Sequence, residues 1–452
     1  MKILLSVLSI RSTAIITYHK GWDTMKKSCF LFFLVLAVFA FTVPVHATPE
    51  GMMDPESIPG NIKLGALKVH PYVYVDQTWT DNVFQRNNMW GPTVYNGRSY
   101  TSSGNRSDTV NTVTPGLRFF LPFGTHLFHL NYNAALRTYN TFDQFNNQDQ
   151  LLHAALGFDF ASGVNLLLRN DFIKATTPPR AIYLMTDDYT LNTTGIEAAY
   201  KFADKYKIKA FYEYETKSYS PSQTNAQWDD YTQNKPGAAL YYRFLPLTSA
   251  LLEFTYQQRG YSRPSYVTTN VDSEIYNLWA GVAWEPASRI KGTFKAGYTE
   301  ARFKNSVPNW NGVGFLGNIN YSYTDRTNFI FNAFRGPVAT SYAAMNAPYG
   351  DYYVSTSASL AVNHQLPSNF VAKANVSYTN NYYRQPGTYT PTPGQTVERQ
   401  NVNIPAFGLG VDYIIRKGTS IGIHYDYSLY DSNIAIEGYK ENRIGVLLSI
   451  AL

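Results

Sequence analysis

The sequence predicts an all-β protein: a transmembrane, antiparallel, up-and-down β-barrel of about 18 strands, within a range of 16–20. Three observations predict this fold. Apolar and polar residues alternate with a period of two in many segments. Short turns alternate along the chain with long polar connections. After residue 47, no apolar run is long enough for a membrane helix. A soluble sandwich shows the same alternation within its strands, but gives no reason for the alternating loop lengths.

Composition supports a wall that faces lipid on one side and water on the other. Aromatic residues make up 16% of the chain, with 37 Tyr and 27 Phe, while charged residues make up only 15%. Ordinary globular domains carry about 25% charged residues. The mean hydropathy of −0.26 is too polar for a bundle of membrane helices. Few charges, many tyrosines and modest hydropathy are typical of outer-membrane barrels.

The N-terminus has the pattern of a secretory signal. Lys26 and Lys27 precede an apolar run over residues 30–43, and Val45-His46-Ala47 resembles a cleavage site. We therefore expect residues 1–47 to comprise an N-terminal extension and a cleaved signal, the signal proper being 25–47. Residues 48–67 would then be a short periplasmic segment and 68–452 the barrel. A retained membrane anchor is the alternative.

Cysteine content and charge exclude several classes of protein. The single cysteine, Cys29, lies in the predicted signal, which excludes a disulfide scaffold. Residues 1–47 hold five of the 38 Lys and Arg residues and one of the 32 Asp and Glu residues. The mature chain is therefore almost neutral and has no basic block, so no nucleic-acid partner is expected.

Strands are predicted from the alternation itself. Near the C-terminus, Ile444, Val446 and Leu448 share one face, whereas Gly445 and Ser449 share the other. The same reading along the chain gives strands at 68–84, 108–121, 126–142, 149–160, 164–176, 189–202, 205–219, 231–243, 249–261, 273–285, 289–303, 312–324, 326–335, 351–363, 369–383, 401–415, 419–430 and 439–452.

The connections predict which end of the barrel lies where. Short turns fall at 122–125, 161–163, 286–288, 325 and 416–418, and long polar stretches at 85–107, 177–188, 220–230, 262–272, 304–311, 336–350 and 384–400. Barrels of the outer membrane have short periplasmic turns and longer extracellular loops. An even strand number returns the chain to the periplasm. Closure is required because unpaired backbone groups in hydrocarbon cost several kcal/mol each.

Two features test this strand map. Pro115, Pro236 and Pro405 lie inside predicted strands, where each removes a ladder hydrogen bond, and they imply bulges or misplaced boundaries. Aromatic residues at strand ends, among them Tyr72, Trp79 and Trp279, predict girdles at the two membrane surfaces. The alternative for these aromatics is a general preference for strands.

Charged residues on the non-lipid faces predict a hydrated lumen, because a charge that faces lipid at the midplane costs about 2–4 kcal/mol. The candidate pore-lining residues are Arg169, Asp171, Lys207, Lys209, Glu213, Glu215, Glu253, Lys291, Lys295, Lys373, His424 and Asp426. They would set selectivity, or would simply solvate the wall. The apolar residues 182–185, in the loop 177–188, would form a constriction or pack on neighbouring loops.

The C-terminus resembles the terminal recognition strand that directs barrel assembly. Its pattern consists of Arg443, Gly445, Leu448, Ile450 and the final Leu452, where an aromatic residue is usual. This pattern predicts an interaction with the barrel-assembly machinery.

The start of the barrel region resembles a known family. Residues 68–76 lead into Thr80-Asp81-Asn82-Val83-Phe84, a polar loop follows, and then comes Asp108 with Pro115-Gly116-Leu117. This order, over about 50 residues, is similar to the opening of the putative β-barrel porin 2 family. The resemblance implies an outer-membrane barrel of a Gram-negative bacterium that accompanies exopolysaccharide production or exosortase-type sorting. It assigns no catalytic residues.

Three functions follow as hypotheses. The first is a passive or weakly selective channel for small polar solutes or polysaccharide, with a link to exopolysaccharide export. The second is a non-conducting structural or docking barrel for a surface export or anchoring system. The third is an outer-membrane hydrolase built on His424, Asp426 and Ser428, which share one strand face. Pore-lining polar residues explain that trio better, so the sequence predicts no enzyme, no cofactor and no metal.

Overall fold

The computed structural model describes residues 51–53, 55, 62–86, 93–95, 98–100, 106–177, 187–220, 230–262, 272–285, 289–304, 307–339, 352–384, 388–392, 395–398, 401–433 and 438–452. The predicted signal at 1–47 lies outside these residues. No helix within the described residues is long and apolar enough to span a membrane.

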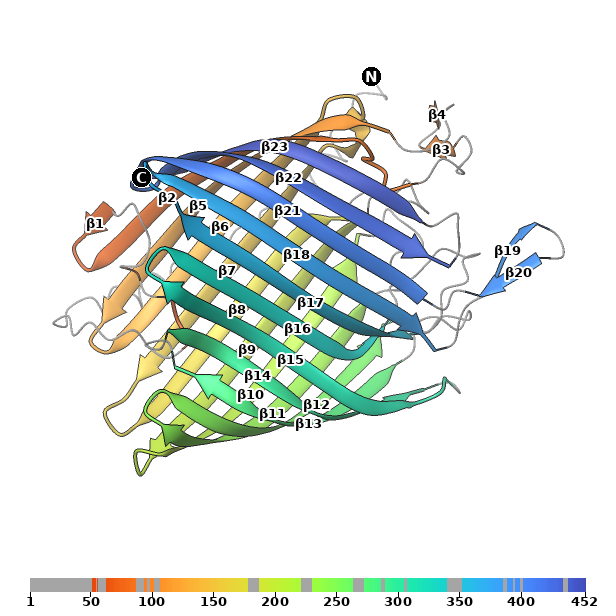
Figure 1. Ribbon diagram of the computed structural model, residues 1–452. Helices are drawn as coiled ribbons and strands as arrows, with labels where there is room; N and C mark the ends of the chain where they lie inside the picture. Colours follow the sequence, from red (N-terminus) through yellow and green to blue (C-terminus); the bar gives the residue numbers. More distant parts are fainter. Residues whose placement is uncertain are drawn as a thin grey trace, which may run out of the picture.

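Eighteen antiparallel strands close into one barrel (Figure 1). Each strand pairs with its neighbours in the chain, and β2 pairs with β23 to close the cylinder, from Tyr72 opposite Ala451 to Thr80 opposite Arg443. The barrel strands are β2 (Leu67–Thr80), β5 (Asp108–Phe123), β6 (His126–Tyr139), β7 (Asn147–Asp159), β8 (Val164–Thr176), β9 (Asp188–Phe202), β10 (Tyr206–Tyr219), β11 (Tyr231–Leu245), β12 (Thr248–Tyr261), β13 (Ser273–Trp284), β14 (Ile290–Phe303), β15 (Trp310–Thr324), β16 (Thr327–Ala339), β17 (Tyr352–Gln365), β18 (Phe370–Tyr383), β21 (Asn401–Arg416), β22 (Thr419–Ser432) and β23 (Tyr439–Ala451).

The remaining described elements lie outside the closed wall. The strand β1 (Ile62–Leu64) forms a hairpin with the start of β2. The pairs β3 (Thr93–Tyr95) with β4 (Arg98–Tyr100) and β19 (Thr388–Thr392) with β20 (Gln395–Glu398) belong to long connections, and a single-turn 3-10 helix spans Asp143–Phe145. We call the end of the barrel that carries these long connections the long-loop end, and the opposite end the short-turn end.

The strand prediction is confirmed in number and nearly in every boundary. Two boundaries differ by four residues. β2 ends at Thr80 rather than residue 84, because residues 81–86 leave the wall, and β16 runs on to Ala339 rather than ending at 335.

The three strand prolines do not create bulges. Around Pro115, pairing with β6 is interrupted between Val113 and Gly116, yet the register is the same on both sides of the gap. Pro236 and Pro405 interrupt the pairing with one neighbouring strand in the same way, while pairing with the other neighbour continues. The predicted bulges are therefore wrong. Each proline leaves out only the ladder bonds on one of its two sides.

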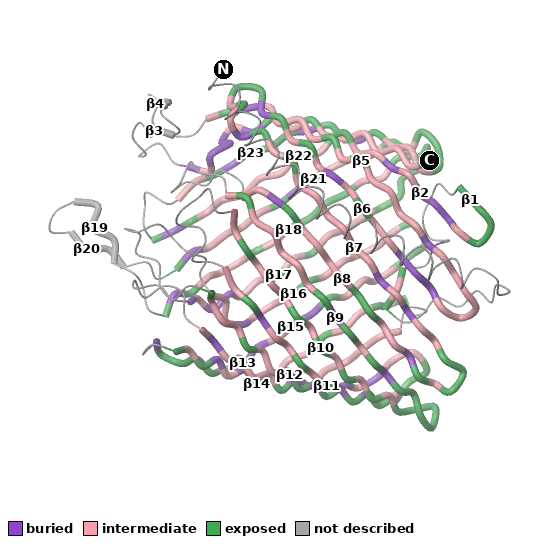
Figure 2. The backbone as a smooth tube through the Cα atoms, turned by 180° about the vertical axis from the view of Figure 1, so that it is seen from behind, coloured by how far each residue is buried: buried purple, intermediate pink, exposed green. Residues whose placement is uncertain are grey.

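The outer surface of the barrel is strongly apolar. Exposed positions recur along the strands of the barrel (Figure 2). Alternate residues of each strand point outward, and large hydrophobic side chains on this face are highly exposed, among them Val313 at 65%, Ile423 at 61% and Leu409 at 57%. Their neighbours along each strand point into the lumen. An exposed apolar surface that extends around the wall is not tolerated in water and indicates contact with hydrocarbon.

Part of the predicted aromatic girdle is wrong. Trp79 is 43% exposed on the outer surface, as a girdle residue should be, but Trp279 and Tyr72 are 8% and 6% exposed and point into the lumen. The error has a simple cause: position along a strand says nothing about the face, and only the register of the neighbouring strands fixes it.

Candidate functional site

Charged side chains gather on the inner face of one half of the barrel, which we call the charged wall and define as the inward-facing residues of β8–β14. Ten basic and five acidic residues point inward there. The basic residues are Arg169, Lys201, Lys207, Lys209, Lys217, Lys235, Arg243, Arg259, Lys291 and Lys295, and the acidic residues are Asp171, Glu197, Glu213, Glu215 and Glu253.

At the centre of the charged wall, one carboxylate serves two cations. The Arg169 guanidinium lies 2.6 Å from Glu213, and the Lys235 ammonium lies 3.7 Å from the same carboxylate. Arg169 on β8 reaches Glu213 on β10 by lying over Gly195 of β9, whose missing β-carbon would stand 2.8 Å from the Arg169 Nε. Glycine is therefore needed on β9 for this ion pair to cross it.

Two further ion pairs continue the charged wall. Lys209 Nζ is 3.2 Å from Glu197, and Lys295 pairs with Glu253 two strands away. The Lys295 and Glu253 side chains are only 13% and 8% exposed, whereas Arg169 is 45% exposed. The wall is thus part solvated and part packed. Glu197 and Lys235 escaped the sequence prediction, although the parity of β9 and β11 would have placed both inward.

The other predicted residues of this half also face inward. Asp171 lies 2.6 Å from the His153 ring, and Lys207 lies over the ring of Tyr241, 4.1 Å from its centroid. Glu215 accepts a hydrogen bond from the Tyr231 hydroxyl. Lys291 is exposed on the inward face of β14, near the short-turn end.

The next strands in the barrel order, β15–β17, present no charged side chain on the inner face of the closed wall within the described residues. Their one Lys, Arg, Asp or Glu residue, Arg335, lies where β16 parts from β15. Amides and hydroxyls replace the charges. Asn318 Nδ2 donates to Asn332 Oδ1 at 2.6 Å, and Asn332 Nδ2 donates to the Ser359 hydroxyl at 3.3 Å. We call this surface the uncharged wall. The inner face of the barrel therefore changes in chemistry between β14 and β15.

The predicted residues beyond the uncharged wall are also inward-facing. Lys373 on β18 pairs with Asp412 on β21. Asp426 on β22 faces Gly408 of β21, where a β-carbon would stand 2.4 Å from the Asp426 Oδ1. The structure thus places every predicted pore-lining residue on the inside of the barrel. Their role in conduction stays a prediction.

His424 does not form the triad considered above. Its Nε2 lies 3.3 Å from the Thr78 hydroxyl and 3.8 Å from Asp76, both on β2. Asp76 and Thr78 thus approach the same ring nitrogen. A triad needs the acid on one nitrogen and the nucleophile on the other. The geometry therefore supplies a link across the barrel seam rather than a nucleophile.

The residues of the predicted assembly signal take distinct positions on β23. Arg443 and Gly445 point inward, and Arg443 pairs with Glu441 at 2.9 Å. Leu448 and Ile450 point outward, and the backbone N–H of Leu452 donates to the Pro71 carbonyl on β2. The hydrogen bond between Leu452 and Pro71 joins β23 to β2 at the short-turn end of the seam. Recognition by an assembly machinery stays a prediction.

The sequence pattern at the start of the barrel region closes the same seam at the other end. Asp81 accepts hydrogen bonds from both the backbone N–H and the side-chain amide of Asn442, at 2.8 and 2.6 Å. The Thr80 hydroxyl donates to Glu441, and Asn82 Nδ2 donates to the Lys440 carbonyl. The Thr-Asp-Asn pattern therefore links the first barrel strand to the last.

The N-terminal segment touches the lumen at the short-turn end. Gly51 lies against Leu167, an inward-facing residue of β8, and a β-carbon at residue 51 would stand 3.1 Å from it. Pro55 is buried. The described part of the predicted 48–67 segment thus contacts the barrel rather than standing apart from it.

The long-loop end of the β16–β17 hairpin leaves the wall and folds into the lumen. Pairing between β15 and β16 stops at Phe315 opposite Arg335, although β15 stays paired with β14 to Trp310 and β16 stays paired with β17 to Ala339. The Arg335 carbonyl lies 3.0 Å from the position of a β-carbon on inward-facing Gly314. We call residues 335–339 and 352–355 the folded hairpin end.

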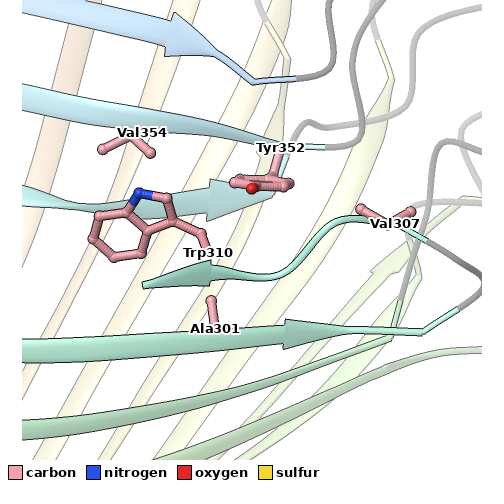
Figure 3. Close-up of a cluster of buried hydrophobic side chains, with 5 residues drawn as sticks. All are labelled: Ala301, Val307, Trp310, Tyr352 and Val354. Carbon is pink, nitrogen blue, oxygen red and sulfur yellow. The ribbon is translucent and has the colours of Figure 1, made fainter. Parts of the chain in front are cut away.

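A cluster of buried side chains holds this hairpin end against the inner wall (Figure 3). Trp310 is 4% exposed, Val354 is 3% exposed, and both Ala301 and Tyr352 are fully buried. Val307 completes the cluster. Arg335 fills the gap between the diverging strands, donating to the Val313 carbonyl at 3.2 Å and to the Thr356 hydroxyl at 2.5 Å. The sequence prediction for residues 182–185, a constriction or packing on neighbouring loops, concerns residues that lie outside the described ones.

A cavity of about 400 Å³ lies between the charged wall and the folded hairpin end. Four cations and three carboxylates of the charged wall line one side, and residues 334–337 of β16 line the other. The cations are Arg169, Lys209, Lys235 and Lys295, and the carboxylates are Glu197, Glu213 and Glu253. The folded hairpin end thus narrows the lumen beside the charged wall. Among the described residues, no group of three or more His, Cys, Asp or Glu side chains is arranged to hold a metal.

A closed barrel with an apolar outside and a hydrated, charged interior defines a porin-like β-barrel protein. The model of the family described as "Putative beta-barrel porin 2" matches residues 59–452, and the chain belongs to that family. No curated protein matches the chain.

Solved structures of similar fold include two proteins of Pseudomonas aeruginosa and one of Neisseria meningitidis. OccK5 (OpdH) is 11% identical with a TM-score of 0.40, covering 85% of this chain and 98% of its own. The outer membrane protein OpdK is 9% identical with a TM-score of 0.42, covering 85% and 99%. The FrpB iron transporter, in its apoprotein form, is 9% identical with a TM-score of 0.41, covering 84% and 81%.

Proposed function

We propose that the protein is a passive, weakly selective channel of the bacterial outer membrane, with its short turns in the periplasm. The observation that carries the proposal is the lumen itself, whose charged wall faces a cavity rather than a packed core. Barrels of this strand number enclose an aqueous path unless a plug fills it. The apolar outer surface supports the membrane location.

The folded hairpin end supports a channel with a defined narrow point rather than an open pore. It lies beside the charged wall, so a solute that passes must come close to the ion pairs there. Pore diameter and lining charges are the features that give channels their selectivity. Single-channel recording in planar bilayers tests the proposal: discrete conductance steps are expected, and their absence after verified insertion would refute it.

A link to exopolysaccharide export is the finer form of this proposal, and the family resemblance suggests it. The uncharged wall fits such a solute, because its amides and hydroxyls can hydrogen-bond to the hydroxyl groups of a neutral sugar. Block of the conductance by a neutral dextran oligosaccharide at millimolar concentration is expected if this finer form holds. Full conductance at that concentration would remove its support.

The second candidate is a docking barrel closed by its own chain. The folded hairpin end favours it, since a hairpin held inside the lumen obstructs part of the path. The two candidates differ in one measurable property. A docking barrel conducts no ions even when the folded hairpin end is released from the wall.

A further inference from the structure

We propose that the cavity between the charged wall and the folded hairpin end binds small organic anions, with carboxylates as the chemical class. This inference rests on the proposed channel function and names the solutes that the channel would favour. The charged side chains that would bind the anion line the cavity itself.

The first argument is the excess of positive charge. The inward faces of β8–β14 carry twice as many basic as acidic side chains. Glu285, which follows β13, pairs with Arg243, and basic side chains still outnumber acidic ones when it is counted. The adjoining uncharged wall adds no carboxylate within the described strands, and Arg335 adds a further cation to the cavity lining. Anions are therefore attracted to this part of the lumen.

The second argument is the unequal sharing of Glu213. Arg169 holds one oxygen of this carboxylate at 2.6 Å, whereas Lys235 approaches the other at only 3.7 Å. A distance of 3.7 Å is too long for a hydrogen bond. The Lys235 ammonium, with 35% of its side chain exposed, can therefore donate to a carboxylate that enters the cavity.

The third argument is the remainder of the cavity lining. Thr255 and Asn277 add neutral hydrogen-bonding groups, and Trp279 and Phe211 add aromatic surface. Each of the three carboxylates in the lining is paired with a cation: Glu197 with Lys209, Glu213 with Arg169 and Glu253 with Lys295. A cavity of about 400 Å³ is at the lower end of the range for small-molecule sites. The combination suits a solute with one or two carboxylates on a short carbon skeleton.

The test is the reversal potential of the wild-type channel under a tenfold KCl gradient, followed by titration with sodium succinate. We expect chloride to be more permeant than potassium, and succinate to reduce the single-channel current. The Lys235→Gln variant should lower the chloride-to-potassium ratio about threefold, because one unit charge near the path is removed, and should weaken the succinate block.

The matched control is Lys304→Gln. Lys304 lies beyond the long-loop end of β14, paired with Asp272, so this variant removes one positive charge outside the cavity. It should behave as wild type. Should Lys235→Gln fail to fold, the wild-type reversal potential still decides the matter.

The possible outcomes separate this inference from the proposed function. A conducting wild-type channel that prefers potassium, or that ignores succinate, overturns the anion site and leaves the channel in place. Equal effects of Lys235→Gln and Lys304→Gln also overturn it. A protein that inserts but does not conduct overturns the channel itself.

Discussion

The ring of Tyr352 on β17 stacks on the ring of Phe303 on β14, with centroids 4.2 Å apart and planes 18° apart. Two strands, β15 and β16, separate them in the barrel order. In a continuous wall, side chains three strands apart lie about 14 Å apart. The contact therefore exists only because the folded hairpin end turns inward and crosses the face of β15.

This contact predicts a specific cross-link. In the double variant Phe303→Cys and Tyr352→Cys, with Cys29 replaced by serine, a short thiol-reactive cross-linker should join the two positions in the folded protein. Mass spectrometry of the digested product is the readout. The control pair is Phe303→Cys with Tyr382→Cys, because Tyr382 is 47% exposed on the outer surface. Equal yields from both pairs would contradict the inward fold.

A second prediction concerns the barrel seam. The His424 ring lies over Gly445, where a β-carbon would stand 2.5 Å from its Cε1 and equally close to the Thr78 hydroxyl. Gly445→Ala should therefore destabilise the barrel by about 1–3 kcal/mol, the usual cost of overpacking. Urea unfolding of the protein in lipid vesicles measures this.

The rescue variant makes the test of the seam specific. Removing the ring in Gly445→Ala with His424→Ala should recover part of the lost stability, because the ring no longer occupies the space of the new methyl group, while the Thr78 hydroxyl stays close to it. If the double variant recovers nothing, the close approach of His424 is not the cause of the loss.

A third prediction concerns the pair of Glu253 and Lys295. Glu253→Gln removes one negative charge from the charged wall and leaves the Lys295 ammonium without its carboxylate. The chloride-to-potassium ratio should rise by about threefold. The double variant Glu253→Gln with Lys295→Gln restores the net charge of the wall and should return the ratio to the wild-type value. An unchanged ratio in the single variant would place this pair away from the ion path.

A fourth prediction concerns pH and the connection before β9. Burial, and then the neighbouring Asp188, raise the pKa of Asp187 above its usual value. The folded state then binds this proton more tightly than the unfolded state, so stability falls as pH rises from the usual carboxyl pKa through the raised one. Asp187→Asn should flatten this part of the pH profile of thermal unfolding. A profile that is the same in both proteins would show that Asp187 is not the group responsible.

The sequence predicts the wall of this barrel far better than its interior. Alternation with period two directly reports the two faces of each strand, so Lys209 and Glu213 could be placed inward from the sequence alone. Ion pairs that span two strands, such as Arg169 with Glu213, depend on the register of three strands. Their one sequence signal is the small residue between them, here Gly195.

The inward fold of β16–β17 could not be read from alternation, because the strands keep their period of two after they leave the wall. A local signal does exist. Gly336 and Pro337 follow directly after Arg335, the last residue of β16 that pairs with β15. Proline has no N–H to donate to a neighbouring strand, so it is typical of an edge strand. Gly336 and Pro337 mark the point where β16 stops pairing with β15.

Single-channel recording of the wild-type protein beside the Trp310→Ala, Tyr352→Ala variant tests the central claim most directly. These two side chains hold the folded hairpin end against the inner wall, and Trp79→Ala on the outer surface is the control. The account predicts discrete conductance steps for wild type and the control, and larger steps for the double variant. Inserted proteins that show no steps, in wild type and double variant alike, would contradict it.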